Sequence, residues 1–515
     1  MGLRVLFAFA ALVSQASAAS ETVFKTRLNG WYKCSDHTFS DQGSSDGQYS
    51  ECATMSAPLC YPGICKTPQF ADPTVDIFVK RMLATNGNPK VATNIWLLQG
   101  GPGYSSSPLE SSMLDLFAQL NETVNIYTMD HRGTGRSTFL DCVAAQVTTT
   151  GSPNGKEIDL EEIGSCAREL ENEYGDLSSF STTSAATDLK TFISKYTNGA
   201  TTIVYGTSYG TMLVERLIHL NPPGVTGYVL DGVATASGAS ADKFFFMSKR
   251  DIDFGIVGDR FFALCSQDAT CSSQFKKPNN LPQTLRGVLT QFEKDPKSAC
   301  ASLMKEVKNM KDYPTSTTLS ITLGAMLTDE EQRKLIPPVV YRLKRCETKD
   351  VDVLRQFINV YNTFSGASSQ DDSYYSPLLF NLIQYSEMWE IPQPSMAEMK
   401  KRTRSTLLRT GAELYSQHYC AFSKEKSQCA TPEQQVDAQT THEYAENLLD
   451  TLDGDKKELV TFNTSSHGAL MYTFLDGGDA WTPTCGVKIV ASYVKSKGNL
   501  KGWTSRAWPE CRPTT

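Results

Sequence analysis

Long apolar runs are absent from the sequence. No stretch reaches the roughly 18 consecutive apolar residues that a membrane-spanning helix requires, so we expect no membrane partner. Internal repeats and low-complexity tracts are also missing. With 40% hydrophobic and 20% charged residues, the composition excludes disordered and collagen-like chains. The 515 residues are enough for two or more core-sized units.

Positive charge is also in short supply. Lys and Arg total 49 against 56 Asp and Glu, which gives a formal net charge of −7. Proteins that bind nucleic acids or anionic membranes need an excess of Lys and Arg to neutralise phosphates. We therefore expect no nucleic-acid partner.

Metal-binding patterns are lacking. The chain has only 6 histidines and no C-x-x-C pair, so we expect no metal site, and nothing in the sequence implies an organic cofactor. The 14 cysteines are an even number, which favours disulfides. Short loops predict three of the pairs: Cys142–Cys166, Cys420–Cys429 and Cys485–Cys511.

The N-terminus has the pattern of a secretory signal. Arg4 supplies a positive charge, residues 5–13 are apolar, and residues 16–18 form an A-x-A cleavage site. We predict that residues 1–19 are a signal peptide and that the protein is secreted. Two sequons, at Asn121 and Asn463, predict a glycoprotein in a eukaryotic host.

Short buried strands alternate with amphipathic helices in the first half of the chain. Strands are predicted at residues 75–83, 93–98, 124–129, 201–205 and 227–230, and helices at 109–120, 156–177, 184–196 and 211–220. This alternation predicts an α/β fold with a mostly parallel central sheet. Residues 20–70 are predicted to be a disulfide-tied leader.

The second half divides into two parts. Strand patterns vanish in residues 236–405, and helical patterns dominate, which predicts a helical cap inserted into the core. A helix at 442–452, a strand at 458–462 and a helix at 484–495 then resume the core. The predicted domains are therefore a core in two parts, 20–235 and 406–515, and a cap at 236–405.

A nucleophile motif lies between a predicted strand and a predicted helix. Residues 206–210 read G-T-S-Y-G, directly after the strand 201–205 and before the helix 211–220. The G-x-S-x-G pattern in this context is typical of a nucleophile elbow, a tight turn that exposes a serine above the sheet. We predict Ser208 as the nucleophile.

An activated serine needs a base, and the base needs an acid to orient it. In enzymes built around this elbow the order is serine, acid, histidine. His467 follows the strand 458–462 after a short loop and is predicted as the general base. The other histidines precede the serine, lie on predicted helices or adjoin a cysteine: His37, His131, His219, His418 and His442.

Three aspartates are candidates for the acid. Asp437 precedes His467 by one helix and one strand and is favoured. Asp231 ends the strand after the elbow, from which an acid can also reach the base. Asp479 is the weakest candidate, because no histidine follows it.

The oxyanion hole is predicted from backbone N–H groups. One belongs to Tyr209, directly after the nucleophile. The other is expected from Gly101 in the GGPG turn at residues 100–103, where glycine allows bare backbone to approach a carbonyl oxygen.

Several motifs together resemble one family. GGPG after a buried strand, DHRGTGRS after the next and GTSYG at the elbow look like the proline iminopeptidase and tripeptidyl aminopeptidase branch of secreted α/β-hydrolases. The segments DAQTTHEYAENLL and LVTFNTSSHG resemble its acid and histidine regions. The resemblance covers most of the chain from about residue 90 onward.

The resemblance implies an α/β-hydrolase fold and a serine exopeptidase that removes residues from peptide N-termini beneath a helical cap. By position, Ser208, Asp437 and His467 would form the triad, and Gly101 and Tyr209 the oxyanion hole. Family members hold the substrate α-amine with acidic cap residues, a position that Glu387 resembles.

Two departures from the family pattern stand out. Gln99 replaces the usual histidine before GGPG. Residues 427–436, which approach Asp437, contain Pro432 and no apolar run, so the strand expected there is missing. The missing strand motivates one alternative to the aminopeptidase, an inactive secreted binding protein. The other alternative is an esterase or lipase, because the same triad and oxyanion hole serve esters.

Overall fold

The structure is a computed structural model of the chain. It describes residues 26–39, 49–234, 238, 240, 243–275, 280–365, 370–423, 442–452, 457–460, 468–472 and 484–500. The predicted signal peptide at residues 1–19 lies outside these ranges. No helix in the described ranges is long and apolar enough to cross a membrane.

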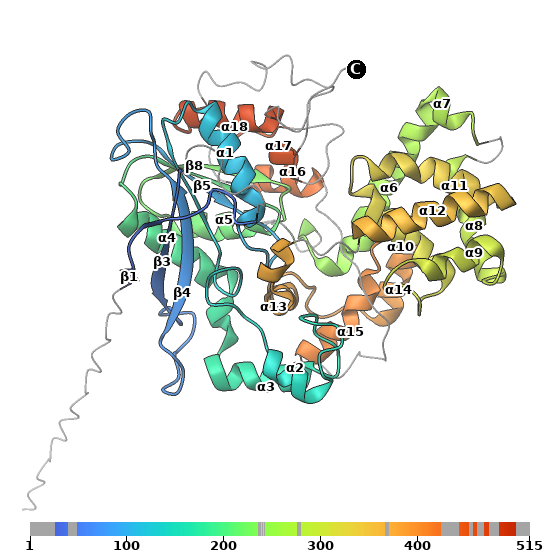
Figure 1. Ribbon diagram of the computed structural model, residues 1–515, viewed down its shortest axis with the longest axis horizontal. Helices are drawn as coiled ribbons and strands as arrows, with labels where there is room; N and C mark the ends of the chain where they lie inside the picture. The colour runs from blue at the N-terminus through green and yellow to red at the C-terminus, as the bar shows by residue number, and fades with distance from the viewer. Residues whose placement is uncertain are drawn as a thin grey trace, which may run out of the picture.

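A single mixed sheet forms the centre of the larger lobe (Figure 1). Its eight strands are β1 (Arg27–Leu28), β2 (Tyr32–Lys33), β3 (Ser50–Pro58), β4 (Thr74–Met82), β5 (Asn94–Leu98), β6 (Asn125–Met129), β7 (Thr202–Thr207) and β8 (Val225–Asp231). The order is β1-β3-β4-β6-β5-β7-β8, with β2 also paired to β3. Strands β5 to β8 are mutually parallel where they pair, whereas β3 and β4 pair antiparallel.

Both faces of the sheet are covered by helices. The helices of this lobe are α1 (Glu110–Gln119), α2 (Val143–Thr149), α3 (Ile163–Tyr174), α4 (Thr182–Tyr196), α5 (Tyr209–Leu220), α16 (His442–Thr451), α17 (Ala469–Tyr472) and α18 (Cys485–Lys495). On β5, Trp96 and Leu98 join a core with residues of α4 and α5, while Ile95 and Leu97 join a core with α1 and α18. This alternation is the two-residue period of a strand buried on both faces.

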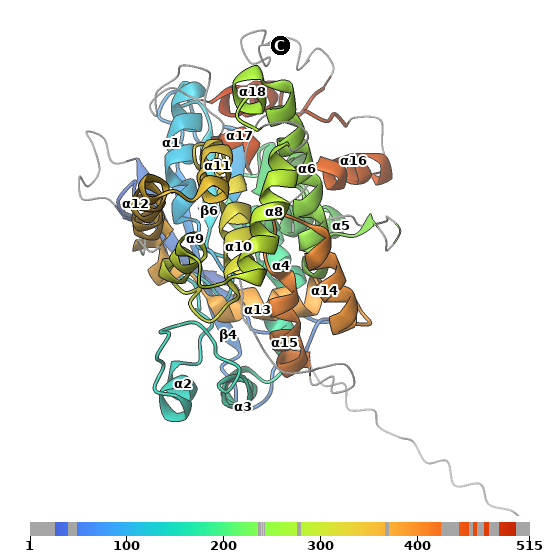
Figure 2. The same ribbon diagram turned by 90° about the vertical axis from the view of Figure 1, so that its right-hand side faces the viewer.

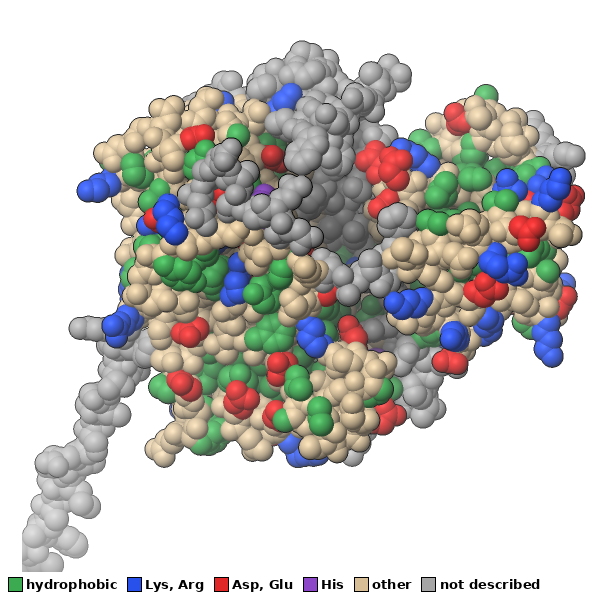
Figure 3. Space-filling view, viewed as in Figure 1, with side chains coloured by type: hydrophobic (Ala, Val, Ile, Leu, Met, Phe, Trp, Pro, Cys, Tyr) green, Lys and Arg blue, Asp and Glu red, His purple; other side chains and the backbone are tan. Residues whose placement is uncertain are grey.

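The second lobe is helical and has its own core (Figure 2). Its helices are α6 (Arg250–Gln267), α7 (Ala269–Ser272), α8 (Leu281–Lys294), α9 (Ala299–Leu303), α10 (Thr315–Leu327), α11 (Ile336–Arg345) and α12 (Thr348–Ser365). The lobe's buried residues run from Phe254 to Ile358 and include Leu407 and Leu408 from a later segment. In the space-filling view the lobe projects to the right of the larger lobe, and acidic and basic side chains are interspersed on its visible face (Figure 3).

Three helices connect the two lobes: α13 (Pro377–Glu387), α14 (Met396–Ser405) and α15 (Ala412–Ser423). Residues of α13 and α15, such as Leu379 and Tyr415, belong to the same core as Trp96 and Tyr209 of the sheet lobe. The region predicted as cap thus contains one part with its own core and another part that packs on the sheet lobe.

Two sequence predictions are corrected. Residues 50–58, predicted to lie in a leader, form β3 and pair along their length with β4. Small residues such as Ala53 and Ala57 fill its buried face, so the strand lacks the β-branched pattern that marks strands in sequences. Residues 458–460, part of the strand predicted at 458–462, have no regular secondary structure and form no ladder with β8, the edge strand of the sheet; residues 461–462 lie outside the described residues.

Disulfides support an extracellular environment. Five are defined within the described residues: Cys34–Cys52, Cys60–Cys65, Cys142–Cys166, Cys265–Cys271 and Cys300–Cys346. The Cys142–Cys166 prediction is confirmed. Cys420 and Cys485 are also disulfide-bonded, but their predicted partners, Cys429 and Cys511, lie outside the described residues.

Candidate active site

Ser208 stands on the predicted elbow between β7 and α5. Its backbone has φ 56° and ψ −126°, a conformation that non-glycine residues rarely adopt. Its N–H donates to the carbonyl oxygen of Asp231 at 2.8 Å, which fixes the turn against the end of β8. A strained serine at a strand-to-helix turn is the geometry of a nucleophile elbow.

The two glycines of the motif allow the elbow to be this tight. A Cβ on Gly206 would lie 2.4 Å from the carbonyl oxygen of Gly210, and a Cβ on Gly210 would lie 2.6 Å from that of Leu98. Strand β7, helix α5 and the end of β5 therefore approach each other so closely that a side chain at either glycine would clash with the backbone.

The GGPG turn lies directly against Ser208. A Cβ on Gly100 would lie 2.6 Å from the Ser208 Cβ and 3.2 Å from its Oγ. Gly101 has φ 121°, which favours glycine. Tyr209 is the first residue of α5, so its N–H is among the helix N-terminal donors that lack an intrahelical acceptor. The structure thus brings together the region predicted to form the oxyanion hole and the predicted nucleophile.

Hydrogen bonds from neighbouring elements hold the GGPG turn in place. Asp130, at the end of β6, accepts from the N–H and the hydroxyl of Ser106 at 2.7 and 2.6 Å. The Thr134 hydroxyl donates to the Gly103 carbonyl oxygen, and the N–H of Ser376, just before α13, donates to the same oxygen at 2.9 Å. The turn is therefore fixed before any substrate binds, which is what an oxyanion hole requires.

The charged residues of the DHRGTGRS motif act as anchors. Arg132 makes a two-pronged ion pair with Asp188 on α4, with both bonds at 2.7 Å and both side chains 0% exposed. Burial alone would raise the pKa of Asp130, but Arg136 and Ser106 hold that pKa below its usual value. The sequence showed the motif but not Asp188, which lies over fifty positions later in a helix without a distinctive pattern.

His131, the histidine of the motif, is buried beside the elbow. Its ring centroid lies 5.6 Å from that of Tyr209, and the residue is 4% exposed. Burial lowers its pKa to about 4, so the imidazole is neutral at pH 7. Its Nε2 has no hydrogen-bond partner among the described residues.

Asp231 is the one acid candidate that lies within the described residues. It ends β8 and is 5% exposed. One carboxylate oxygen accepts from the Tyr205 hydroxyl at 2.8 Å and from the Leu470 N–H at 3.0 Å. Leu470 follows His467 by three residues in the sequence. The carboxylate of Asp231 therefore contacts both the elbow strand and the chain that leads away from the predicted base.

The other predicted triad members, His467 and Asp437, lie outside the described residues, as does Asp479. Their roles remain predictions from the sequence.

Glu387 lies close to the elbow and accepts a hydrogen bond from the start of a neighbouring helix. Its Oε1 accepts from the N–H of Thr182 at 2.8 Å, at the N-terminus of α4. The hydroxyl of Thr182 is 3.0 Å from that of Tyr209. The pKa of Tyr209 is raised above its usual value, mainly by burial and secondly by the negative charge of Glu387. Thr182 thus connects the cap carboxylate to the residue after the nucleophile.

A family profile described as the alpha/beta hydrolase fold matches residues 93–277, a range that contains the GGPG turn, the DHRG motif and the elbow. The chain has the α/β-hydrolase fold. The parallel strands β5 to β8 carry all three motifs at their carboxyl ends, as expected for ligand sites in such sheets. The comparisons support a hydrolase but name no peptidase family.

Other comparisons are distant. No curated protein matches the chain. An esterase from Exiguobacterium antarcticum is 10% identical, with 57% of this chain and 72% of the esterase covered and a TM-score of 0.22. The Cif epoxide hydrolase from Acinetobacter nosocomialis is 10% identical, with 61% and 69% covered and a TM-score of 0.24. The match to VrEH2, at 13% identity and a TM-score of 0.21, covers 42% of this chain and spans about half of VrEH2, 48%.

Proposed function

We propose that the protein is a secreted serine hydrolase of the aminopeptidase type. The observation that carries this proposal is the strained Ser208 turn packed against Gly100 of a fixed glycine turn. The disulfides support secretion. The motif resemblance supports peptides as substrates, with cleavage near the N-terminus.

In the proposed reaction, His467 accepts the Ser208 hydroxyl proton as the serine oxygen attacks the scissile carbonyl carbon. The resulting oxyanion accepts hydrogen bonds from the N–H groups of Gly101 and Tyr209. Each such bond contributes roughly 3 kcal/mol to lowering the barrier. The protonated base then donates its proton to the leaving amine, and water, activated by the same base, releases the acyl group from Ser208.

The substrate's free α-amine would bind Glu387. This carboxylate lies in the cap helix α13 and is linked through Thr182 to Tyr209. An ammonium bound to a carboxylate forms a charge-assisted hydrogen bond. A substrate held in this way would be cleaved only close to its N-terminus.

The test compares a fluorogenic peptide that has a free α-amine with the same peptide acetylated at that amine. We expect kcat/KM to fall by about tenfold to a hundredfold on acetylation, the usual contribution of one charged hydrogen bond. Glu387→Gln keeps an oxygen that can accept from Thr182 but removes the charge, so it should erase most of this preference. Glu398→Gln, a cap residue outside the site, is the matched control and should keep it.

Equal turnover of the free and acetylated peptides would contradict the aminopeptidase assignment. Turnover of esters without turnover of peptides would instead identify an esterase. No turnover of either, with a folded protein, would favour the binding protein.

The acid is assigned by a second experiment. Sequence order favours Asp437, whereas the contact of Asp231 with Leu470 supports Asp231. In an active enzyme, Asn at the true acid position lowers kcat by about four orders of magnitude, because the base takes the wrong tautomer. We compare Asp437→Asn with Asp231→Asn. A large loss in the Asp231 variant with a silent Asp437 variant would overturn the sequence assignment.

A further inference from the structure

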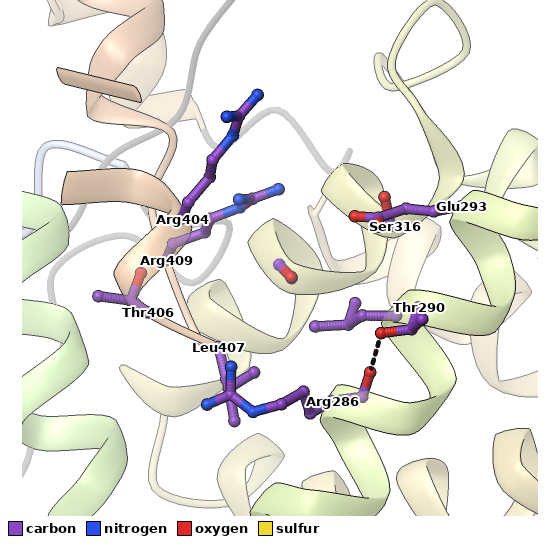
Figure 4. Close-up of a pocket in the computed structure, with 10 residues that line it drawn as sticks. Arg286, Thr290, Glu293, Ser316, Arg404, Thr406, Leu407 and Arg409 are labelled. Carbon is purple, nitrogen blue, oxygen red and sulfur yellow. Dashed lines mark hydrogen bonds between the residues drawn. The ribbon is translucent and has the colours of Figure 1, made fainter. Parts of the chain in front are cut away.

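A small cavity that opens to solvent lies in the helical lobe, where exposed residues such as Arg286, Glu293 and Arg404 contribute to its lining (Figure 4). Its volume is about 150 Å³. Three arginines contribute to the lining, and in Figure 4 they extend in different directions: Arg286 from α8, Arg404 from the end of α14, and Arg409 from the segment that follows α14. The cavity is thus assembled from parts of the chain more than a hundred residues apart.

The cavity has an excess of positive charge. Its lining contains three arginines and one carboxylate, Glu293. Within the described residues, none of the three arginines forms an ion pair. The whole chain is acidic, with a formal charge of −7, so carboxylates are available elsewhere. Like charges around one cavity repel each other unless an anion neutralises them.

Arg409 has an unused donor in the protein interior. Its Nη2 donates to the Thr317 hydroxyl at 3.0 Å, but its Nε is buried without a hydrogen-bond partner among the described residues. Buried donors are nearly always paired, so this N–H is a candidate donor to a bound anion. The backbone of Arg409 is fixed, because a Cβ on Gly324 of α10 would lie only 2.1 Å from its carbonyl oxygen.

Hydroxyl groups complete the lining. Ser316 and Ser320 are buried on one face of α10, four positions apart. Ser316 lies in the first turn of α10, where the helix dipole favours negative charge. Thr290 and Thr406 supply two further hydroxyls, whose protons already go to carbonyl oxygens. Guanidinium and serine hydroxyl groups are donors that suit an anion with several oxygens.

We propose that this cavity binds a small oxyanion: phosphate or sulfate, either free or as the terminal group of an ester. The volume is below the range of about 300–1,000 Å³ that is typical for larger organic ligands. Planar guanidinium groups match the oxygens of phosphate and sulfate. The proposal is independent of the reaction at Ser208.

The test is calorimetric titration of the full chain with sodium phosphate, at constant ionic strength maintained with sodium chloride. We expect saturable binding of one phosphate per chain with a dissociation constant of about 1 mM or below. A parallel titration with glycerol phosphate separates the two sources: tighter binding than phosphate assigns an ester, and weaker binding assigns the free ion. Absence of saturable heat with both ligands would overturn the proposal.

Variants sharpen the test. Arg409→Gln and Arg404→Gln should each weaken phosphate binding about tenfold, because each removes a charge-assisted hydrogen bond. Arg168→Gln, on an exposed position of α3, is the matched control and should leave binding unchanged. If the control weakens binding as much as the cavity variants do, the binding is non-specific and the proposal fails.

Glu293→Gln should change the affinity for phosphate in the opposite direction. It removes the cavity's carboxylate from an exposed position, so the fold should be retained. Phosphate binding should become about threefold tighter, because one repulsive charge is lost. Weaker binding in this variant would contradict the proposed site even if the arginine variants failed to fold.

Discussion

Charged side chains form ion pairs at the sheet edge, whereas the arginines that line the cavity of the helical lobe do not among the described residues. At the sheet edge, Arg132 pairs with Asp188, Lys80 pairs with Glu110 and Arg136 pairs with Asp130. The cavity is lined by three arginines, none of which has a carboxylate in ion-pair contact among the described residues.

This difference distinguishes charged side chains that stabilise the fold from charged side chains that can bind a ligand. A buried pair whose hydrogen bonds are all satisfied holds its loops in one arrangement, and at the sheet edge these loops carry the candidate catalytic groups. Unpaired arginines contribute little to the fold but retain their capacity to bind an anion. The comparison therefore predicts large stability effects at the sheet edge and small ones in the cavity.

The largest effect is expected for Arg132→Met. The substitution leaves Asp188 buried without its cation, and it also removes the donors to the carbonyl oxygens of Leu59 and Ser179. We expect a loss of about 3–5 kcal/mol in the free energy of unfolding. Urea denaturation measures it. Lys33→Met, which breaks a 3.9 Å pair with Glu51 at an exposed lysine, is the control and should cost less than about 1 kcal/mol.

The next effect concerns pH. The pKa of His131 is lowered to about 4 by burial, whereas an unfolded histidine has a pKa near 6.5. The unfolded state therefore binds more protons in this window, and stability falls as the pH drops from about 6.5 to 4. We expect a loss of about 2–3 kcal/mol from this group. His131→Gln should flatten this part of the stability profile, and an unchanged profile would contradict the assignment.

A smaller effect is expected for Thr134→Val. The variant keeps the shape but loses the hydrogen bonds to the carbonyl oxygens of Gly103 and Tyr374. We expect a loss of about 1 kcal/mol in stability. Because the GGPG turn is loosened, kcat should fall about tenfold with little change in KM, as for an interaction used in the transition state. A change in KM alone would show that the turn binds substrate without stabilising the oxyanion.

The smallest effect is expected for Arg404→Gln. The side chain is exposed and forms no ion pair among the described residues, so stability in phosphate-free buffer should change by less than about 0.5 kcal/mol. The same urea experiment measures it. A loss as large as that of Arg132→Met would remove the distinction between the two regions.

The sequence was sufficient to predict the parallel strands and the turn that carries Ser208, because short apolar runs and a glycine-framed turn are local signals. The Ser208 turn and Gly100 come together because both follow strands of one parallel sheet, which the alternation of strands and helices predicts. The strand β3 was missed because its alanines and serines carry no strand pattern.

The partners of the motif residues could not be predicted. Asp188 lies on α4 and Ser376 lies just before α13, where the sequence shows only helical periodicity, and long-range folding places them beside Arg132 and Gly103. The sequence also does not indicate that the three arginines line a cavity, since arginines usually face solvent. Position in the fold, rather than a motif, gives these residues their roles.

Labelling with a fluorophosphonate probe tests the central claim most directly, because the probe reacts only with an activated serine. We predict covalent labelling of the wild-type protein with one probe per chain, and no labelling of Ser208→Ala, which circular dichroism should show to be folded. Failure to label the folded wild type, or equal labelling of the variant, would contradict the claim that Ser208 is the nucleophile of an active hydrolase.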